Sequence, residues 1–189
     1  LNFVKDNDFT LIRHEKRGIS QSYNSLLTPE GINSSKMIEF KECQLYSSSY
    51  IRCIQTVINH VKNKKLVINI DHSLDEYESE EDKHHFVNDT IEKRKSLRLP
   101  FKSYINTENS VIKEKEKPIF NNLYDNIKTK SIDITKFLIS LWLKNKQKEN
   151  YIIVSHQTTI AILKKILTNN EKNIQDLEKE IDIGSITKI

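Results

Sequence analysis

The sequence of 189 residues is 37% hydrophobic and 30% charged, and its 30 basic and 26 acidic residues give a net charge of +4. This size suits a single domain with a full core, and lysines interleaved with acidic residues do not favour a nucleic-acid partner. No apolar stretch approaches the length of a membrane span and no secretory signal pattern opens the chain, so we expect a cytoplasmic protein without a membrane partner.

The first half of the chain alternates short β-like runs with helical patterns. Thr28-Pro29-Glu30 has a threonine N-cap and a proline in the first turn, which is typical of a helix start. The run at 66–70 is continuous and β-branched, as in a buried parallel strand. The predicted elements are a strand at 9–13, a helix from 29 to about 42, a strand at 44–48, a helix at 50–62 and a strand at 66–70.

The second half begins with a region at about 75–130 that breaks this rhythm, with charged clusters and two prolines. We interpret it as an insertion or cap within one domain spanning 1–189. The predicted elements after it are a helix at 132–146 with Phe137, Leu138, Leu141 and Trp142 in the core, a strand at 151–155, a helix at 157–168 and an edge strand at 184–189. This alternation predicts a three-layer α/β/α sandwich with a mostly parallel sheet. Cys43 and Cys53 match no metal-binding spacing and are expected to be reduced, buried thiols.

Each of four predicted strands is followed by polar residues suited to binding a phosphoryl group. These are Arg13-His14-Glu15, Ser47-Ser48-Ser49 with Arg52, Leu74-Asp75-Glu76, and Ser155-His156-Gln157. Because ligands bind at the carboxyl ends of the strands in an open α/β sheet, we expect these groups to converge. Guanidinium groups, a protonated imidazole and the start of the helix at 157–168 would together suit the charge of a phosphoryl group.

These motifs, in this order, resemble those of the histidine phosphatase superfamily with its phosphoglycerate mutase-like fold. The family pattern is Arg-His-Gly, then Ser-Ser-Pro with a following arginine, then Leu-x-Glu, then Ser-His-Gly. Thr28-Pro29-Glu30-Gly31 and Gly184-Ser185-Ile186-Thr187 match weaker family positions. The resemblance covers both ends of the chain and leaves 78–130 unmatched.

The resemblance implies a role for each site residue. His14 would be the nucleophile that forms a phosphohistidine, and Glu76 the general acid. The implied phosphate ligands are Arg13, Arg52, His156 and Gln157, while Arg17 is either a further ligand or a surface residue. No metal or cofactor is expected, because the arginines and the second histidine carry the positive charge.

Several positions leave alternatives open. Asp75 and Glu78 compete with Glu76 for the role of acid, and His72 is either near the site or a turn residue. Glu15 stands where the family has glycine, and it could pair with Lys16 or Arg17 or point to solvent. Ser49 replaces a common proline, and Gln157 replaces a common glycine.

Three activities fit the pattern. The leading one is a metal-independent phosphatase acting on a phosphorylated small molecule or phosphoprotein through phosphohistidine. The others are a phosphoglycerate mutase-like phosphotransferase and a non-catalytic member of the family that binds phospho-ligands or proteins. Retention of the complete motif set favours catalysis over binding alone, and the short chain favours hydrolysis over the mutase reaction.

Overall fold

The computed structural model describes residues 2–18, 25–76, 78–79, 90–114, 119–120 and 123–189. Its centre is a six-stranded sheet in the order β5-β3-β2-β7-β1-β8. All neighbours are parallel except β8, which runs antiparallel to β1 at the edge. The strands are β1 (Asp8–Arg13), β2 (Gln44–Ser47), β3 (Ile68–Ile70), β5 (Ile105–Asn106), β7 (Asn150–Ser155) and β8 (Ile186–Lys188).

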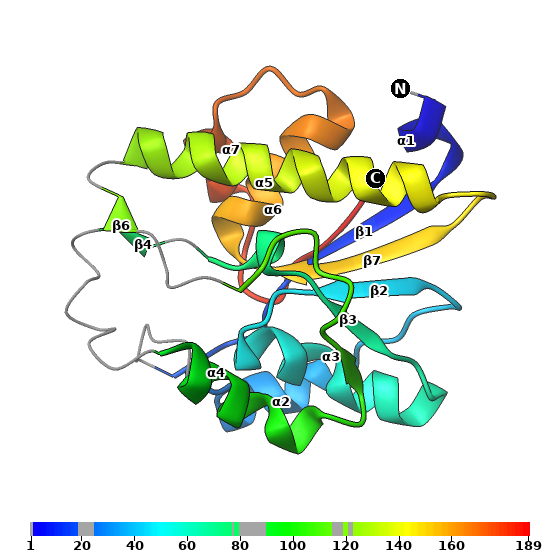
Figure 1. The fold of residues 1–189 in the computed structure, drawn as a ribbon, viewed down its shortest axis with the longest axis vertical. Helices are drawn as coiled ribbons and strands as arrows, with labels where there is room; N and C mark the ends of the chain where they lie inside the picture. The colour runs from blue at the N-terminus through cyan, green and yellow to red at the C-terminus, as the bar shows by residue number, and fades with distance from the viewer. Residues whose placement is uncertain (1, 19–24, 77, 80–89, 115–118, 121–122) are drawn as a thin grey trace.

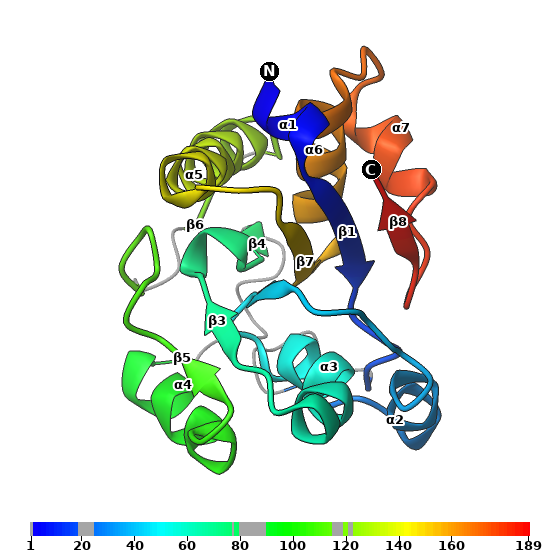
Figure 2. The ribbon, with the colours of Figure 1, turned by 90° about the vertical axis from the view of Figure 1, so that its right-hand side faces the viewer.

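Helices cover both faces of this sheet, which confirms the predicted three-layer α/β/α sandwich (Figures 1 and 2). One face carries α5 (Leu123–Lys144), α6 (Gln157–Thr168) and α7 (Ile174–Lys179), with α1 (Asn2–Asp6) beside them. The other carries α2 (Pro29–Ser35), α3 (Ile51–Lys64) and α4 (Ile91–Arg98). Each face has its own cluster of buried apolar side chains.

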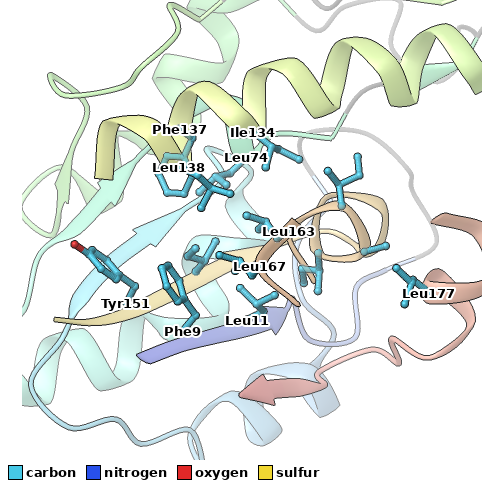
Figure 3. Packing of buried hydrophobic residues seen from close by; sticks show 14 of the residues in the cluster. Phe9, Leu11, Leu74, Ile134, Phe137, Leu138, Tyr151, Leu163, Leu167 and Leu177 are labelled. Carbon is cyan, nitrogen blue, oxygen red and sulfur yellow. The ribbon is translucent and has the colours of Figure 1, made fainter. Parts of the chain in front are cut away.

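The two clusters explain why apolar residues predominate in the central stretches of the strands. On β1, Phe9 and Leu11 face α5 and α6, whereas the next residue, Ile12, joins the cluster beneath α3. Figure 3 shows Phe9 and Leu11 among the leucines and aromatic rings of the first cluster. Because successive side chains of a strand point to opposite faces, a strand covered on both sides must be hydrophobic at every position.

The region at 75–130 contributes more to the sheet than an insertion would. Its residues Ile105–Asn106 pair with β3 as the edge strand β5. A 3₁₀ turn, η1 (His72–Leu74), precedes the region, and another, η3 (Leu99–Phe101), follows α4. A separate parallel pair is formed by β4 (Glu78–Ser79) and β6 (Ile119–Phe120). Part of the region lies outside the described residues.

Helix α5 differs from its prediction in length and in one buried residue. It begins at Leu123, well before the expected start at 132. Phe137, Leu138 and Leu141 are buried as predicted, but Trp142 is 57% exposed, so its prediction as a core residue is wrong. Adjacent residues are about 100° apart around a helix, so the stripe that buries Leu141 leaves Trp142 on the outer side.

Lys16, three residues after β1, lies against the start of α2. Thr28 caps the N-terminus of α2 through Gly31, as the Thr-Pro-Glu-Gly pattern predicted, and its own backbone N–H donates to the carbonyl of Lys16. A Cβ at Gly31 would lie 2.3 Å from that carbonyl oxygen, so only glycine allows this close approach. Within the described part of the chain, no helix is both long and apolar enough to cross a membrane.

Candidate active site

The polar motifs meet at the carboxyl edge of the sheet. Strands β1 and β7 pair in register, so that Arg13 lies opposite Ser155, and His14 and His156 follow directly. The two imidazole rings are 5.4 Å apart between their centroids. The hydroxyl of Ser155 donates to the carbonyl of Leu74 over 2.6 Å, which ties the end of β7 to η1 and brings Glu76 to the same edge.

His14 has the geometry of a neutral nitrogen nucleophile. Its Nδ1 lies 2.8 Å from the carbonyl oxygen of Glu15, and since a carbonyl can only accept, Nδ1 carries the proton. The other ring nitrogen, Nε2, is then left with its lone pair. Burial, followed by the charge of Arg52, lowers the pKa of His14 to about 3, so the ring stays neutral at physiological pH.

Arg52 connects the polar groups that lie beside His14. Its side chain is fully buried in the first turn of α3. The Nη2 atom lies 2.5 Å from Oε2 of Glu76 and 3.2 Å from Nδ1 of His156. The guanidinium also lies over the ring of Tyr50, with 4.5 Å from Cζ to the ring centroid. The fork is thereby held in one orientation.

Glu76 occupies the position expected of the candidate acid. Its carboxylate is partly exposed and reaches both Arg52 and, over 3.6 Å, Nδ1 of His156. Asp75, its rival for the role of acid, is buried elsewhere, among Ser48, Ser49 and His72. The side chain of Glu78 lies outside the described residues.

The remaining predicted ligands lie at the side of this cluster. The Nη1 of Arg13 donates to the carbonyl of Ile181 over 2.7 Å, and among the described residues its buried Nε has no hydrogen-bond partner. Burial lowers the pKa of Arg13 and the charge of Glu76 opposes this, so both groups share one electrostatic environment. The positive charge of Arg17 contributes to lowering the pKa of His14. The Nη1 atom of Arg17 lies 3.5 Å from the carbonyl oxygen of Gly18.

Gln157 turns its side chain away from the cluster. Its amide nitrogen donates to the carbonyl of Glu178, 2.7 Å away in α7. As the first residue of α6, Gln157 can still offer its backbone N–H to an anion, together with the dipole of the helix. A role in phosphate binding therefore falls on its backbone rather than on its side chain.

Glu15 takes a position that neither alternative anticipated. Its carboxylate rests against Gly184, where a Cβ would lie 2.6 Å from Oε2 and where φ is +69°. Lys16 pairs instead with Glu30, over 2.6 Å. Burial raises the pKa of Glu15. The residue that replaces the family's glycine therefore faces the segment before β8, and a glycine in that segment makes room for it.

Two buried charges lie behind the site, and sequence reasoning assigned no role to the first of them, Lys130. Lys130 on α5 donates to the carbonyls of Ser73 and Asp75, and burial lowers its pKa to about 8. It thereby fixes the backbone that presents Glu76. The signal was available, because Lys130 lies on the same helical stripe as Ile127 and Ile134. The second charge, Asp75, accepts four hydrogen bonds, one of them from His72.

The Asp75 carboxylate should make the fold sensitive to acid. Burial alone would raise its pKa, but the hydrogen bond and charge of His72, with the donors of Ser49, lower it to about 2 from 3.8. A lowered folded-state pKa gives stability that is present above about pH 4 and lost as the pH falls toward 2. We expect this to amount to roughly 2 kcal/mol.

Urea unfolding of the wild type and of Asp75→Asn between pH 7 and pH 2.5 measures this contribution. The free energy of unfolding of Asp75→Asn should fall less over the acid range than that of the wild type. Equal slopes in the two proteins would contradict the assignment.

His72 gives the free energy of unfolding an opposite pH dependence at higher pH. Burial alone would lower the pKa of His72, but Asp75 and Glu114 raise it. The stability that protonated His72 contributes is therefore lost as the pH rises through that raised pKa.

No protein-family model matches the chain, and no curated protein matches it. Solved structures are similar. The mycobacterial glucosyl-3-phosphoglycerate phosphatase is 14% identical, with a TM-score of 0.61 over 96% of this chain and 89% of its own. Phosphoserine phosphatase from Entamoeba histolytica is 19% identical, with a TM-score of 0.57 over the same shares. Ecdysone phosphate phosphatase from Bombyx mori is 11% identical, with a TM-score of 0.61 over 88% of this chain and 81% of its own.

These similarities cover nearly the whole chain and follow the same mostly parallel sheet. The sequence identities are low, so what the similarities establish is the architecture. The chain has the phosphoglycerate mutase-like fold that these phosphatases share.

Proposed function

We propose that this protein is a metal-independent phosphatase that hydrolyses phosphomonoesters through a phosphohistidine at His14. One observation carries the proposal. A neutral, buried His14 lies at the same sheet edge as Arg52, Glu76 and His156, and these three are linked by contacts of 2.5 to 3.6 Å. The neighbouring structures are named as phosphatases of phosphorylated small molecules, which supports a substrate of that class.

The first half of the reaction transfers the phosphoryl group to the protein. The lone pair of His14 Nε2 attacks phosphorus while the bond from phosphorus to the ester oxygen breaks. The departing oxygen takes a proton from the Glu76 carboxyl. Arg52, Arg13 and a protonated His156 stabilise the charge on the equatorial oxygens.

The second half releases phosphate. The Glu76 carboxylate removes a proton from water as the water oxygen attacks phosphorus. The bond from phosphorus to Nε2 then breaks and its electron pair returns to the His14 ring. Both half-reactions use the same positive groups, so the protein's own side chains supply the charge that a metal would otherwise supply.

Turnover of p-nitrophenyl phosphate in the presence of EDTA tests the proposal. We expect the wild type to release p-nitrophenol at an undiminished rate when EDTA is added. Phosphate binding without any turnover would contradict the proposal and favour the non-catalytic alternative. Transfer of the phosphoryl group to a second acceptor at the expense of hydrolysis would favour the phosphotransferase.

Glu76→Gln should slow hydrolysis by an amount that depends on the leaving group of the substrate. An alkyl alcohol leaves only if its oxygen is protonated, so we expect kcat/KM for an alkyl phosphate to fall by about 10²-fold to 10³-fold. The nitrophenolate of p-nitrophenyl phosphate leaves without a proton, and its kcat/KM should fall by less than about tenfold. Both values come from steady-state kinetics on the two substrates.

The wild type assayed on the same two substrates provides the reference ratio. An unchanged rate with the alkyl phosphate would show that Glu76 is not the acid. An equal loss on both substrates would show that Glu76 binds or positions the substrate without protonating it.

A further inference from the structure

A buried chain of hydrogen bonds starts at His156. Nε2 of His156 lies 2.9 Å from Oγ of Ser48, and this hydroxyl lies 2.9 Å from Oδ1 of Asp75. Oδ2 of Asp75 lies 3.0 Å from Nδ1 of His72. All four side chains are buried. None of the reaction steps above uses Ser48, Asp75 or His72.

The partners of Ser48 decide where its hydroxyl hydrogen points. A hydroxyl has one hydrogen to donate and two lone pairs. The backbone N–H of Tyr50 donates to one lone pair over 3.3 Å. The ionised carboxylate of Asp75 can only accept, so it receives the hydroxyl hydrogen. The second lone pair therefore faces Nε2 of His156, and this nitrogen must carry the proton.

The opposite nitrogen of His156 faces the site. Its Nδ1 lies 3.2 Å from Nη2 of Arg52 and 3.6 Å from Oε2 of Glu76. In the neutral ring, Nδ1 accepts from the guanidinium. When a second proton is added, it enters at Nδ1 and points to the place where Arg52 and Glu76 meet.

We propose that Asp75, acting through the hydroxyl of Ser48, fixes the proton of neutral His156 on Nε2, so that the second proton enters at Nδ1, the nitrogen that faces the phosphoryl group. This inference rests on the proposed function. Asp75 and Ser48 are positioning residues, since neither touches the reacting atoms. The arrangement resembles a carboxylate that orients a catalytic histidine, with a hydroxyl inserted between the two groups.

His72 holds the far side of the Asp75 carboxylate. Among the described residues, three charged groups face His72: Asp75, Glu114 and Arg98. A carboxylate oxygen of Glu114 lies 3.9 Å from Nε2 of His72. The guanidinium of Arg98 donates two hydrogen bonds to Glu114, of 2.6 and 3.0 Å. The backbone N–H of His72 donates to Oγ of Ser110. His72 in η1 contacts the Asp75 carboxylate, and Ser110 and Glu114, which follow β5, contact His72. The position of the carboxylate therefore rests on contacts within the protein and not on substrate.

The tautomer of His156 can be read directly by ¹⁵N NMR of the imidazole nitrogens, with the His156 signals identified by their loss in His156→Gln. In the neutral wild-type ring we expect the proton on Nε2. Ser48→Ala removes this acceptor and leaves the weaker Sγ of Cys53 beside Nε2, 3.6 Å away, so the share of the neutral ring that is protonated on Nδ1, where Oε2 of Glu76 can accept, should rise. Ser49→Ala is the matched control, because it removes a hydroxyl that donates to the other oxygen of the same carboxylate, Oδ2, and it should leave the proton on Nε2.

Asp75→Asn separates the charge of Asp75 from its role as an acceptor. The backbone N–H of Ser49 donates to Oδ1 over 2.6 Å, which keeps an oxygen at that position, so Ser48 retains its acceptor and the tautomer should not change. Only the negative charge is lost. We expect kcat/KM for p-nitrophenyl phosphate to fall about 100-fold in Ser48→Ala, about tenfold in Asp75→Asn and less than about threefold in Ser49→Ala.

Two results would overturn the inference. One is a neutral wild-type His156 with its proton on Nδ1, which needs no variant to observe. The other is a loss of activity in Ser48→Ala no larger than in Ser49→Ala. If the wild type shows no turnover at all, the proposed function fails, while the NMR spectra still decide whether Ser48 and Asp75 set the tautomer.

Discussion

His14→Gln is expected to lower turnover of p-nitrophenyl phosphate by at least about 10⁴-fold, because no other group in the cluster can replace the nucleophile. The wild type, mixed rapidly with a substrate labelled in its phosphoryl group and then denatured, should carry label on the protein. That label should be lost in acid and kept in alkali, as expected for a bond from phosphorus to nitrogen. The variant should carry none.

A matched histidine provides the control. His60 is buried on α3 with its ring 4.6 Å from that of Phe40, and it is not part of the polar cluster. His60→Gln should retain both turnover and label. Label that persists in His14→Gln would assign the nucleophile to another residue.

The pH dependence of labelling gives a further check on the same group. The pKa of His14 is about 3, lowered by burial and by the charge of Arg52. The ring is therefore neutral in the free protein throughout the range above about pH 4. Protonation of His14 should not slow formation of the phosphoprotein between pH 7 and pH 5, and any loss of rate in that range must come from another group.

The main site residues could be predicted because each follows a hydrophobic strand. His14 follows β1, Arg52 comes shortly after β2, Glu76 after β3 and His156 after β7. In a parallel sheet these strand ends face one edge, so the order of short motifs along the chain was enough to predict that they converge. The edge position of β5 and the early start of α5 were not predictable in this way, because they lie among charged residues with weak periodicity.

The roles of Asp75 and Glu76 could not be separated from the sequence. Asp75 has an extended backbone, with φ of −68° and ψ of 153°, so these two neighbours point in different directions. The carboxylate of Glu76 reaches Arg52 and His156, and that of Asp75 lies among Ser48, Ser49 and His72. The direction of each carboxylate depends on Ser48 and His72. These two residues come from different segments of the chain and meet only in the folded protein.

Arg52→Lys is expected to lower kcat/KM for p-nitrophenyl phosphate by about 10²-fold, and Arg52→Met by about 10³-fold or more. Arg52 is the fully buried group that joins Glu76 to His156, and its planar fork can offer parallel hydrogen bonds to two phosphoryl oxygens. A lysine keeps the charge and loses this fork. The affinity for inorganic phosphate, measured by calorimetry, should fall in the same order.

Arg94→Lys is the matched control for a general effect of removing a buried guanidinium. Arg94 is as deeply buried and lies near a carboxylate, Glu114, in the region at 75–130. Its replacement should lower the free energy of unfolding and change kcat/KM by less than about fivefold. If the two lysine variants lose activity equally, the loss reflects the fold rather than the phosphate fork.

The stability of the Arg52 variants separates binding from folding more directly. When Arg52 is replaced, Glu76 loses an ion pair, but its side chain is 37% exposed and water can solvate its charge. The variants should therefore remain folded at neutral pH, with denaturation midpoints in urea that fall by much less than their activity. A variant that binds phosphate as tightly as the wild type would show that the oxygens are held by Arg13 and the start of α6, and that Arg52 serves only to orient Glu76 and His156.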